Sequence, residues 1–156
     1  MKIGIIVSPG GHLDQALLVM EAFQNHEVFL ISYVSENLKG FTYHGIKRTY
    51  WVKAFGDTKL GVFFSLLLSC FYFIKIFWRE KPVVLFSTGA EITVPAFYIG
   101  KYLFGSALIF LESATRVKTP SLAGKLIFPI ADLFLVQWDS LREILGEKAR
   151  YVGRVI

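Results

Sequence analysis

The chain has 156 residues, which is the size of one domain with one hydrophobic core. Its net charge of +5 comes from Lys and Arg that are spread along the chain without a basic tract, so it favours anionic partners such as phosphates or acidic lipid headgroups and does not indicate nucleic acid. A hydrophobic content of 54% predicts apolar surface that faces something other than water. The single cysteine, Cys70, excludes an intrachain disulfide and fits a reducing compartment, and no signal peptide is expected before the strand-like run that starts at Lys2.

Six apolar runs alternate along the chain with segments of helix length. We predict helices near residues 11–24, 58–80, 91–104, 121–129 and 138–146, and strands at 2–8, 27–34, 46–52, 83–88, 107–112 and 132–137. Continuous apolar strands separated by helices are typical of a parallel sheet that is covered on both faces. The predicted fold class is therefore α/β, a doubly wound parallel sheet in a single domain over residues 1–156. Ligands of such sheets bind at the carboxyl ends of the strands.

The first of these carboxyl ends is the sequence Ser-Pro-Gly-Gly-His at 8–12. Gly10 and Gly11 lack Cβ atoms, so a ligand can approach the backbone N–H groups, and the start of the following helix favours a phosphate. His12 would lie at the mouth of this turn, where a neutral imidazole could act as a general base. The same five residues also fit an ordinary glycine turn with a surface histidine.

Two common nucleotide-binding motifs can be compared with this turn. A dinucleotide-binding fold needs Gly-x-Gly-x-x-Gly, but the third glycine is missing after Gly10, and no clear acid closes the second strand because Glu36 lies beyond it. A P-loop is excluded, since no Gly-Lys-Ser/Thr follows a glycine turn.

Residues 60–78 form the most apolar segment of the chain. As a helix the segment is about 28 Å long, near the thickness of a bilayer core, but a single span would separate strands that share one sheet. Its apolar arc covers about 240°, more than packing on a sheet requires, and basic residues flank it, which favours a helix of about 58–80 lying in the membrane interface. A buried core helix and a protein–protein face are the alternatives. We expect the membrane-facing residues to be Phe63, Leu67, Phe73, Phe77 and Trp78.

Two further carboxyl ends carry polar residues. Ser-Thr-Gly at 87–89 repeats the pattern of strand, glycine turn and helix, and two such turns on one sheet can bind a pyrophosphate or sugar from two sides. An ordinary turn with a Ser or Thr helix cap is the alternative. After the next strand, Glu112 and Arg116 could bind an acceptor sugar and a phosphate, or could form a salt bridge with each other.

Six motifs in this order resemble a known family. They look like the membrane-associated subunit of the two-subunit N-acetylglucosaminyltransferase that adds the second sugar of dolichol-linked oligosaccharides, and its prokaryotic counterparts in exopolysaccharide and capsule synthesis. The chain resembles, more distantly, the N-terminal half of the peptidoglycan glycosyltransferase that makes lipid II. The motifs are Ser-Pro-Gly-Gly-His at 8–12, Ser-Thr-Gly at 87–89, Glu-Ser-Ala-Thr-Arg-Val-Lys at 112–118, Ser-Leu-Ala-Gly-Lys-Leu at 121–126, Ala-Asp-Leu-Phe-Leu-Val-Gln-Trp at 131–138 and Tyr-Val-Gly-Arg at 151–154.

This resemblance implies a single Rossmann-like domain that corresponds to the N-terminal, acceptor-side half of a GT-B glycosyltransferase. A polyprenyl-diphosphate-linked sugar would be the acceptor, and a separate partner subunit would hold the UDP-sugar. By motif, His12 takes the position of the catalytic base, Gly10 and Gly11 face the phosphates, and Thr88, Gly89 and Glu112 lie on the acceptor side. Arg116 is added as a phosphate ligand because of its charge.

The sequence departs from the eukaryotic members of this family in two ways. Leu-Asp-Gln follows the histidine where they usually carry a Thr and a Glu, which leaves the acceptor open. Their N-terminal transmembrane anchor is missing, which assigns membrane contact to residues 60–78. We therefore expect a peripheral or monotopic protein on the cytoplasmic face of the membrane.

The function predicted from the sequence is one subunit of a split transferase that adds N-acetylglucosamine or another hexose to a lipid-diphosphate-linked sugar with inversion. The chain alone is expected to be inactive. No cofactor and no metal are expected, because no metal-ligand spacing and no Asp-x-Asp occur. Two alternatives stay open: a non-catalytic membrane scaffold for a fully catalytic partner, and a stand-alone nucleotide-binding module.

Overall fold

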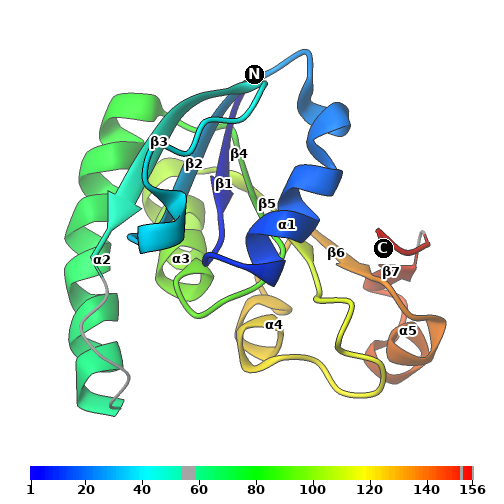
Figure 1. Cartoon of the computed structure of the whole chain (residues 1–156). Helices are drawn as coiled ribbons and strands as arrows, with labels where there is room; N and C mark the ends of the chain where they lie inside the picture. The colour runs from blue at the N-terminus through cyan, green and yellow to red at the C-terminus, as the bar shows by residue number, and fades with distance from the viewer. Residues whose placement is uncertain (54–58, 152, 156) are drawn as a thin grey trace.

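The computed structural model describes residues 1–53, 59–151 and 153–155, and within the long helix the side chains of residues 59, 60 and 62–66 lie outside the description. Parallel strands form one sheet in the order β3-β2-β1-β4-β5-β6-β7 (Figure 1). Because the order reverses between β1 and β4, the sheet is doubly wound, as predicted. The strands are β1 (Lys2–Ile6), β2 (Glu27–Tyr33), β3 (Ile46–Val52), β4 (Val84–Ser87), β5 (Ala107–Leu111), β6 (Leu133–Val136) and β7 (Ala149–Tyr151).

Successive side chains of each strand point to opposite faces of the sheet, and the apolar ones form two cores, one on each face. Phe29 and Ile31 contribute to one core, which the helices α2, α3, α4 and α5 cover, while Val28 and Leu30 contribute to the other, which α1 covers (Figure 1). The α-helices are α1 (Gly11–Leu18), α2 (Lys59–Glu80), α3 (Thr93–Phe104), α4 (Leu122–Ile127) and α5 (Asp139–Leu145). The 3₁₀ helices η1 (Met20–Phe23) and η2 (Glu36–Leu38) lie between α1 and α2 in the chain, η1 before β2 and η2 after it.

The predicted elements are present, and their ends differ by a few residues. The helix expected over 11–24 ends at Leu18 and continues as the 3₁₀ turn η1. The edge strand β7 was not predicted, because its three residues, of which only Ala149 is buried, form no apolar run.

The exposed and buried faces of α2 correct part of the sequence prediction. Phe73 and Phe77 were expected to face the membrane, but both are 0% exposed, and their rings stack against each other with centroids 5.8 Å apart in the core. Leu67 and Trp78 are exposed, Trp78 to 75% of its surface, which the predicted membrane contact requires, whereas Phe63 lies outside the described side chains. Within the described residues, no helix combines the length and the apolarity that crossing a bilayer requires.

The last residue of α2 fixes this helix to the sheet. Glu80 is 1% exposed, and its carboxylate accepts two hydrogen bonds from Arg48 Nη1, at 2.9 and 3.0 Å, and one from the Tyr50 hydroxyl. Lys2 Nζ lies 3.1 Å from the same carboxylate. Burial alone would raise the pKa of Glu80, but the hydrogen bonds from Tyr50, Arg48 and Lys2 outweigh it and lower the pKa. The side chain therefore stays charged at neutral pH and links α2 to β1 and β3.

Candidate functional site

The first glycine turn lies where β1 ends, at the point where the strand order reverses. Gly10 has a φ of 84°, which favours glycine, and precedes the first residue of α1. A Cβ atom added at Gly10 or at Gly11 would meet no atom within 4 Å, so the backbone here is open to a ligand. This is the location and the openness that the sequence predicted for a phosphate-binding turn.

The second glycine turn lies beside the first, and reciprocal hydrogen bonds join the two. His12 Nδ1 lies 2.9 Å from the Thr88 carbonyl oxygen, and Thr88 Oγ1 donates to the His12 carbonyl oxygen at 2.6 Å. Thr88 is fully buried, and a Cβ atom at Gly89 would lie 2.6 Å from His12 Cε1. The structure thus brings three of the predicted site residues together at the ends of β1 and β4.

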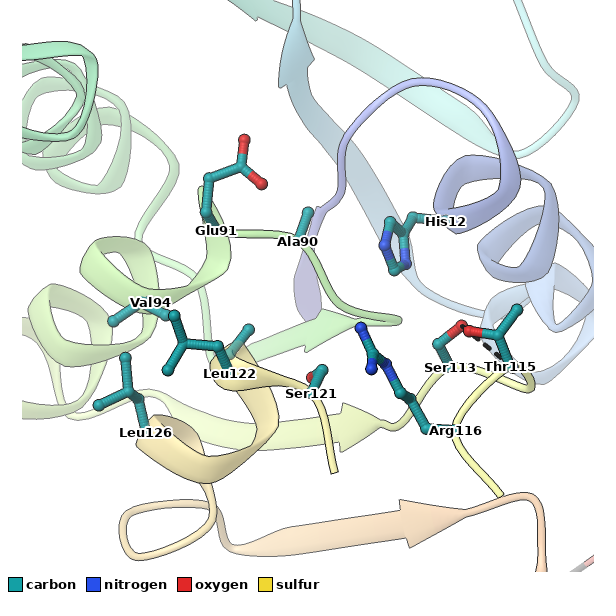
Figure 2. Close-up of a pocket in the computed structure, with 11 residues that line it drawn as sticks. His12, Ala90, Glu91, Val94, Ser113, Thr115, Arg116, Ser121, Leu122 and Leu126 are labelled. Carbon is teal, nitrogen blue, oxygen red and sulfur yellow. Dashed lines mark hydrogen bonds between the residues drawn. The ribbon is translucent and has the colours of Figure 1, made fainter. Parts of the chain in front are cut away.

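A cavity of about 390 Å³ opens in front of these turns (Figure 2). One wall is polar and carries His12, Ser113, Thr115 and Arg116, with Ser113 and Thr115 hydroxyls 3.1 Å apart. The opposite wall is apolar and is formed by α3 and α4 through Val94, Ala123, Leu122 and Leu126. The cavity can therefore contact an anionic group and an apolar group at the same time.

Arg116 provides the positive charge of this cavity. Its guanidinium points into the space between His12 and Ser121 (Figure 2). The turn that carries it is closed by a hydrogen bond from the Arg116 N–H to the Ser113 carbonyl at 2.9 Å. Among the described residues no ion pair is formed by Arg116, so the alternative of a salt bridge with Glu112 is wrong.

Glu112 does not line the cavity, which corrects its expected role as an acceptor ligand. It is fully buried, and its carboxylate accepts hydrogen bonds from Ser113 N at 2.9 Å, Ser121 N at 2.9 Å and Ser121 Oγ at 3.1 Å. A Cβ atom at Gly124 would lie 2.1 Å from Glu112 Oε2, so this glycine gives the carboxylate room. Glu112 thus holds the start of α4 against the end of β5, behind the cavity wall.

Two buried glutamines, to which the sequence analysis assigned no role, hold the loop that carries Arg116. Gln15 Oε1 accepts hydrogen bonds from Ala114 N at 3.3 Å and from Gln137 Nε2 at 2.9 Å. Gln137 Nε2 also donates to the Glu112 carbonyl at 3.1 Å, and Gln137 Oε1 accepts from Val155 N at 3.0 Å. Gln137 directly follows β6 and Gln15 lies one turn after His12, and these two positions were the signal that the sequence offered.

Glu91 is a further cavity residue that was missed. It follows the second glycine turn and lines the cavity beside Ala90 (Figure 2). Burial raises the pKa of Tyr33, and the nearby Glu91 carboxylate raises it further by its charge and by a hydrogen bond with the phenol. Tyr33 therefore stays a neutral donor that can orient the Glu91 carboxylate.

Comparison with known proteins identifies the family of this chain. The family described as "Oligosaccharide biosynthesis protein Alg14 like" matches residues 3–155. The chain belongs to the Alg14-like family. The UDP-N-acetylglucosamine transferase subunit ALG14 of Rattus norvegicus is 30% identical over 119 residues, which cover 72% of this Alg14-like chain and 53% of the rat protein. The corresponding subunit of Schizosaccharomyces pombe is 27% identical over 97% of this chain and 81% of its own length. The chain thus spans about half the length of the rat relative.

Solved structures confirm the predicted fold of this Alg14-like chain. MurG of Acinetobacter baumannii is similar with a TM-score of 0.75 and 14% identity, over 98% of this chain and 45% of MurG. The UDP-GlcNAc 2-epimerase of Methanocaldococcus jannaschii, solved with UDP-GlcNAc and UDP, gives a TM-score of 0.76 and 17% identity over 99% of this chain and 47% of the epimerase. In both, the chain matches one half of a larger protein.

Proposed function

We propose that this chain is the acceptor-side subunit of a two-subunit UDP-sugar-dependent transferase, with UDP-N-acetylglucosamine as the donor and a polyprenyl-diphosphate-linked sugar as the acceptor. The observation that carries the proposal is the cavity at the reversal of strand order, which combines His12 with Arg116, a cation that forms no ion pair within the described part of the chain. The family membership supports it, because relatives are named as transferase subunits. A partner that resembles the other half of the matched two-domain structures would hold the donor.

Arg116, His12 and the turn at Gly10 each have a chemical role in this proposal. Arg116 and the backbone N–H groups after Gly10 bind the acceptor diphosphate, because a guanidinium and a helix start both favour phosphate oxygens. His12, directly or through a water, accepts the proton of the acceptor hydroxyl. The hydroxyl oxygen attacks C1 of the donor sugar from the side opposite UDP, the bond from C1 to the UDP oxygen breaks, and the configuration at C1 inverts. The partner stabilises the departing UDP.

The decisive experiment measures sugar transfer by the chain reconstituted with its donor-binding partner. We expect the chain alone to be inactive, and His12→Ala to lower kcat by about 100- to 10,000-fold while folding and partner binding persist. His26→Ala is the matched control, since His26 does not line the cavity and its ring Nδ1 lies 2.9 Å from the neighbouring Asn25 carbonyl oxygen. Turnover by the chain alone would remove the split-enzyme proposal. Near-normal kcat in the reconstituted His12→Ala pair would instead favour the scaffold alternative.

We further propose that α2 docks the subunit on the cytoplasmic face of the membrane. Leu67, Phe71, Ile74 and Trp78 are exposed and follow the spacing i, i+4, i+7, i+11, so they form one apolar stripe along the solvent side of the helix. Arg79 lies exposed at its end, where it can contact anionic headgroups. Such a stripe favours a helix that lies in the membrane interface.

The docking proposal is tested by binding to anionic liposomes. Phe71→Ser with Trp78→Ser should lower partitioning by about a hundredfold or more, because each aromatic loses about 1.5–3 kcal/mol of apolar burial. Tyr102→Ser, at a residue that is equally exposed on α3, is the control and should bind like the parent chain. Unchanged binding of the double variant would contradict docking through α2.

A further inference from the structure

We propose that Thr88 and Gly89 are positioning residues for His12, and that they hold its imidazole as the tautomer with hydrogen on Nδ1 and a free lone pair on Nε2. Both residues were expected to bind the acceptor, but neither lines the cavity. The catalytic consequence of this positioning rests on the proposed role of His12 as the base, whereas the tautomer itself does not.

The tautomer follows from the chemistry of the Thr88 carbonyl. A carbonyl oxygen can only accept a hydrogen bond, so at 2.9 Å His12 Nδ1 must carry the hydrogen. In a neutral imidazole the other nitrogen, Nε2, then keeps its lone pair. His12 lines the cavity, so Nε2 is the nitrogen available to accept a proton from a bound hydroxyl.

The Thr88 side chain fixes the backbone from which the imidazole projects. Its Oγ1 donates to the His12 carbonyl at 2.6 Å, so the start of α1 cannot move relative to the end of β4 without breaking this bond. Because the hydroxyl is buried and already donates within the protein, it is not free to bind a ligand. Thr88 thus contacts His12 twice, through its carbonyl and through its hydroxyl.

Gly89 makes room for the ring. A Cβ atom at this position would lie 2.6 Å from His12 Cε1 and 2.9 Å from Nδ1, and the φ of 125° also favours glycine. The glycine cannot shift easily, because its carbonyl accepts from Thr93 Oγ1 at 2.7 Å and its N–H donates to Ser87 Oγ at 3.1 Å. A side chain at position 89 would therefore displace the imidazole rather than the turn.

The first test reads the tautomer directly and needs no activity. In ¹⁵N-histidine-labelled chain, long-range ¹H–¹⁵N correlation spectra recorded at alkaline pH should show the hydrogen of the His12 ring on Nδ1. Gly89→Ala should change this pattern because the ring leaves the Thr88 carbonyl. Gly40→Ala is the control for backbone strain, since Gly40 has a φ of 75° and open space around it. Hydrogen on Nε2 in the parent chain would overturn the proposal.

The second test separates positioning from acceptor binding in the reconstituted pair. Thr88→Val keeps the shape of the side chain but removes the hydroxyl, and should lower kcat about tenfold with the acceptor KM unchanged, which matches the loss of one hydrogen bond. Thr88→Ser restores the donor and should restore kcat. A raised KM with unchanged kcat would make Thr88 an acceptor ligand and overturn the proposal.

The two proposals fail in different ways. If His12→Ala keeps its kcat while the spectra show hydrogen on Nδ1, the base assignment fails and the positioning stands. If the spectra show hydrogen on Nε2 while His12→Ala is inactive, the positioning fails and the base assignment stands.

Discussion

Two buried carboxylates lie at opposite ends of the parallel strands, Glu80 where the strands begin and Glu112 where they finish. Different kinds of hydrogen-bond donor hold them. Glu80 ends α2 at the edge where the strands begin, and Arg48 and Lys2 neutralise it with help from the Tyr50 hydroxyl. Glu112 follows β5 at the end of the sheet where the strands finish, and its donors among the described residues are neutral groups of Ser113 and Ser121. Both are almost inaccessible to water.

The difference shows how the two edges use their cations. At the end of the sheet that carries Glu80, the cations form ion pairs that hold α2 on the sheet. These pairs contribute to stability and leave little charge for a ligand. At the Glu112 edge backbone N–H groups and a hydroxyl satisfy the carboxylate, so Arg116, four residues later, keeps its charge for the cavity. A carboxylate paired with Arg116 would have removed the cation that an acceptor diphosphate needs.

The largest loss of stability is expected for Glu112→Ala. Removing the carboxylate leaves the N–H groups of Ser113 and Ser121 without acceptors in a buried place, so the free energy of unfolding should fall by about 3 kcal/mol. Urea denaturation followed by circular dichroism measures this. Glu147→Ala, at an exposed position, is the control and should change stability by less than about 0.5 kcal/mol. An unchanged unfolding midpoint together with a raised acceptor KM would contradict the structural role of Glu112.

Glu80→Gln should cost less, about 2 kcal/mol in the free energy of unfolding. The amide keeps one oxygen as an acceptor, and the cationic ends of Arg48 and Lys2 are partly exposed and can turn to water. Activity of the reconstituted pair should be unchanged, because the site lies at the other edge of the sheet. The same denaturation experiment measures stability, and a variant as stable as the parent chain would show that Glu80 does not anchor α2.

The Glu80 network also predicts how stability depends on pH. The pKa of Glu80 is lower in the folded chain than in the unfolded chain, where it is about 4.3. Its contribution is therefore fully present above about pH 4.3 and is lost as the pH falls through the folded pKa. The difference in unfolding free energy between the parent chain and Glu80→Gln should narrow as the pH falls from about 6 to about 3. A difference that stays constant over this range would contradict the lowered pKa.

The sequence was sufficient for the fold because apolar runs and helix-length segments alternate along the chain. The sequence did not show which apolar residues of α2 are buried in the core and which are exposed to solvent. Phe73 and Trp78 are both large and apolar, and only the position of the helix on the sheet buries the first and exposes the second. That position depends on Glu80 and on Arg48, which are distant in sequence.

The candidate site was predictable in its location but less so in the role of each residue. Both glycine turns lie at carboxyl ends of strands, which the pattern of the chain indicates. The bonds between His12 and Thr88 join residues 76 positions apart, so no local signal predicts them. Glu112 was misjudged for a related reason: whether a carboxylate at the end of a strand points into the cavity or behind it depends on Ser121, in a later helix cap.

Arg116→Gln should have the smallest effect on stability. It tests most directly whether the cation beside Glu112, unlike those beside Glu80, serves a ligand and not the fold. The guanidinium is exposed and forms no ion pair among the described residues, so the free energy of unfolding should change by less than about 0.5 kcal/mol. The acceptor KM should rise about tenfold or more, because a charge-assisted contact to a phosphate is lost. Arg142→Gln, on α5, is the matched control because Arg142 pairs with Asp139 on its own helix, at 2.6 Å, and does not line the cavity. Steady-state kinetics of the reconstituted pair, with acceptor concentration varied, measure the change in KM. If Arg116→Gln lowers stability by as much as Glu80→Gln and leaves KM unchanged, Arg116 holds the fold and does not bind the acceptor.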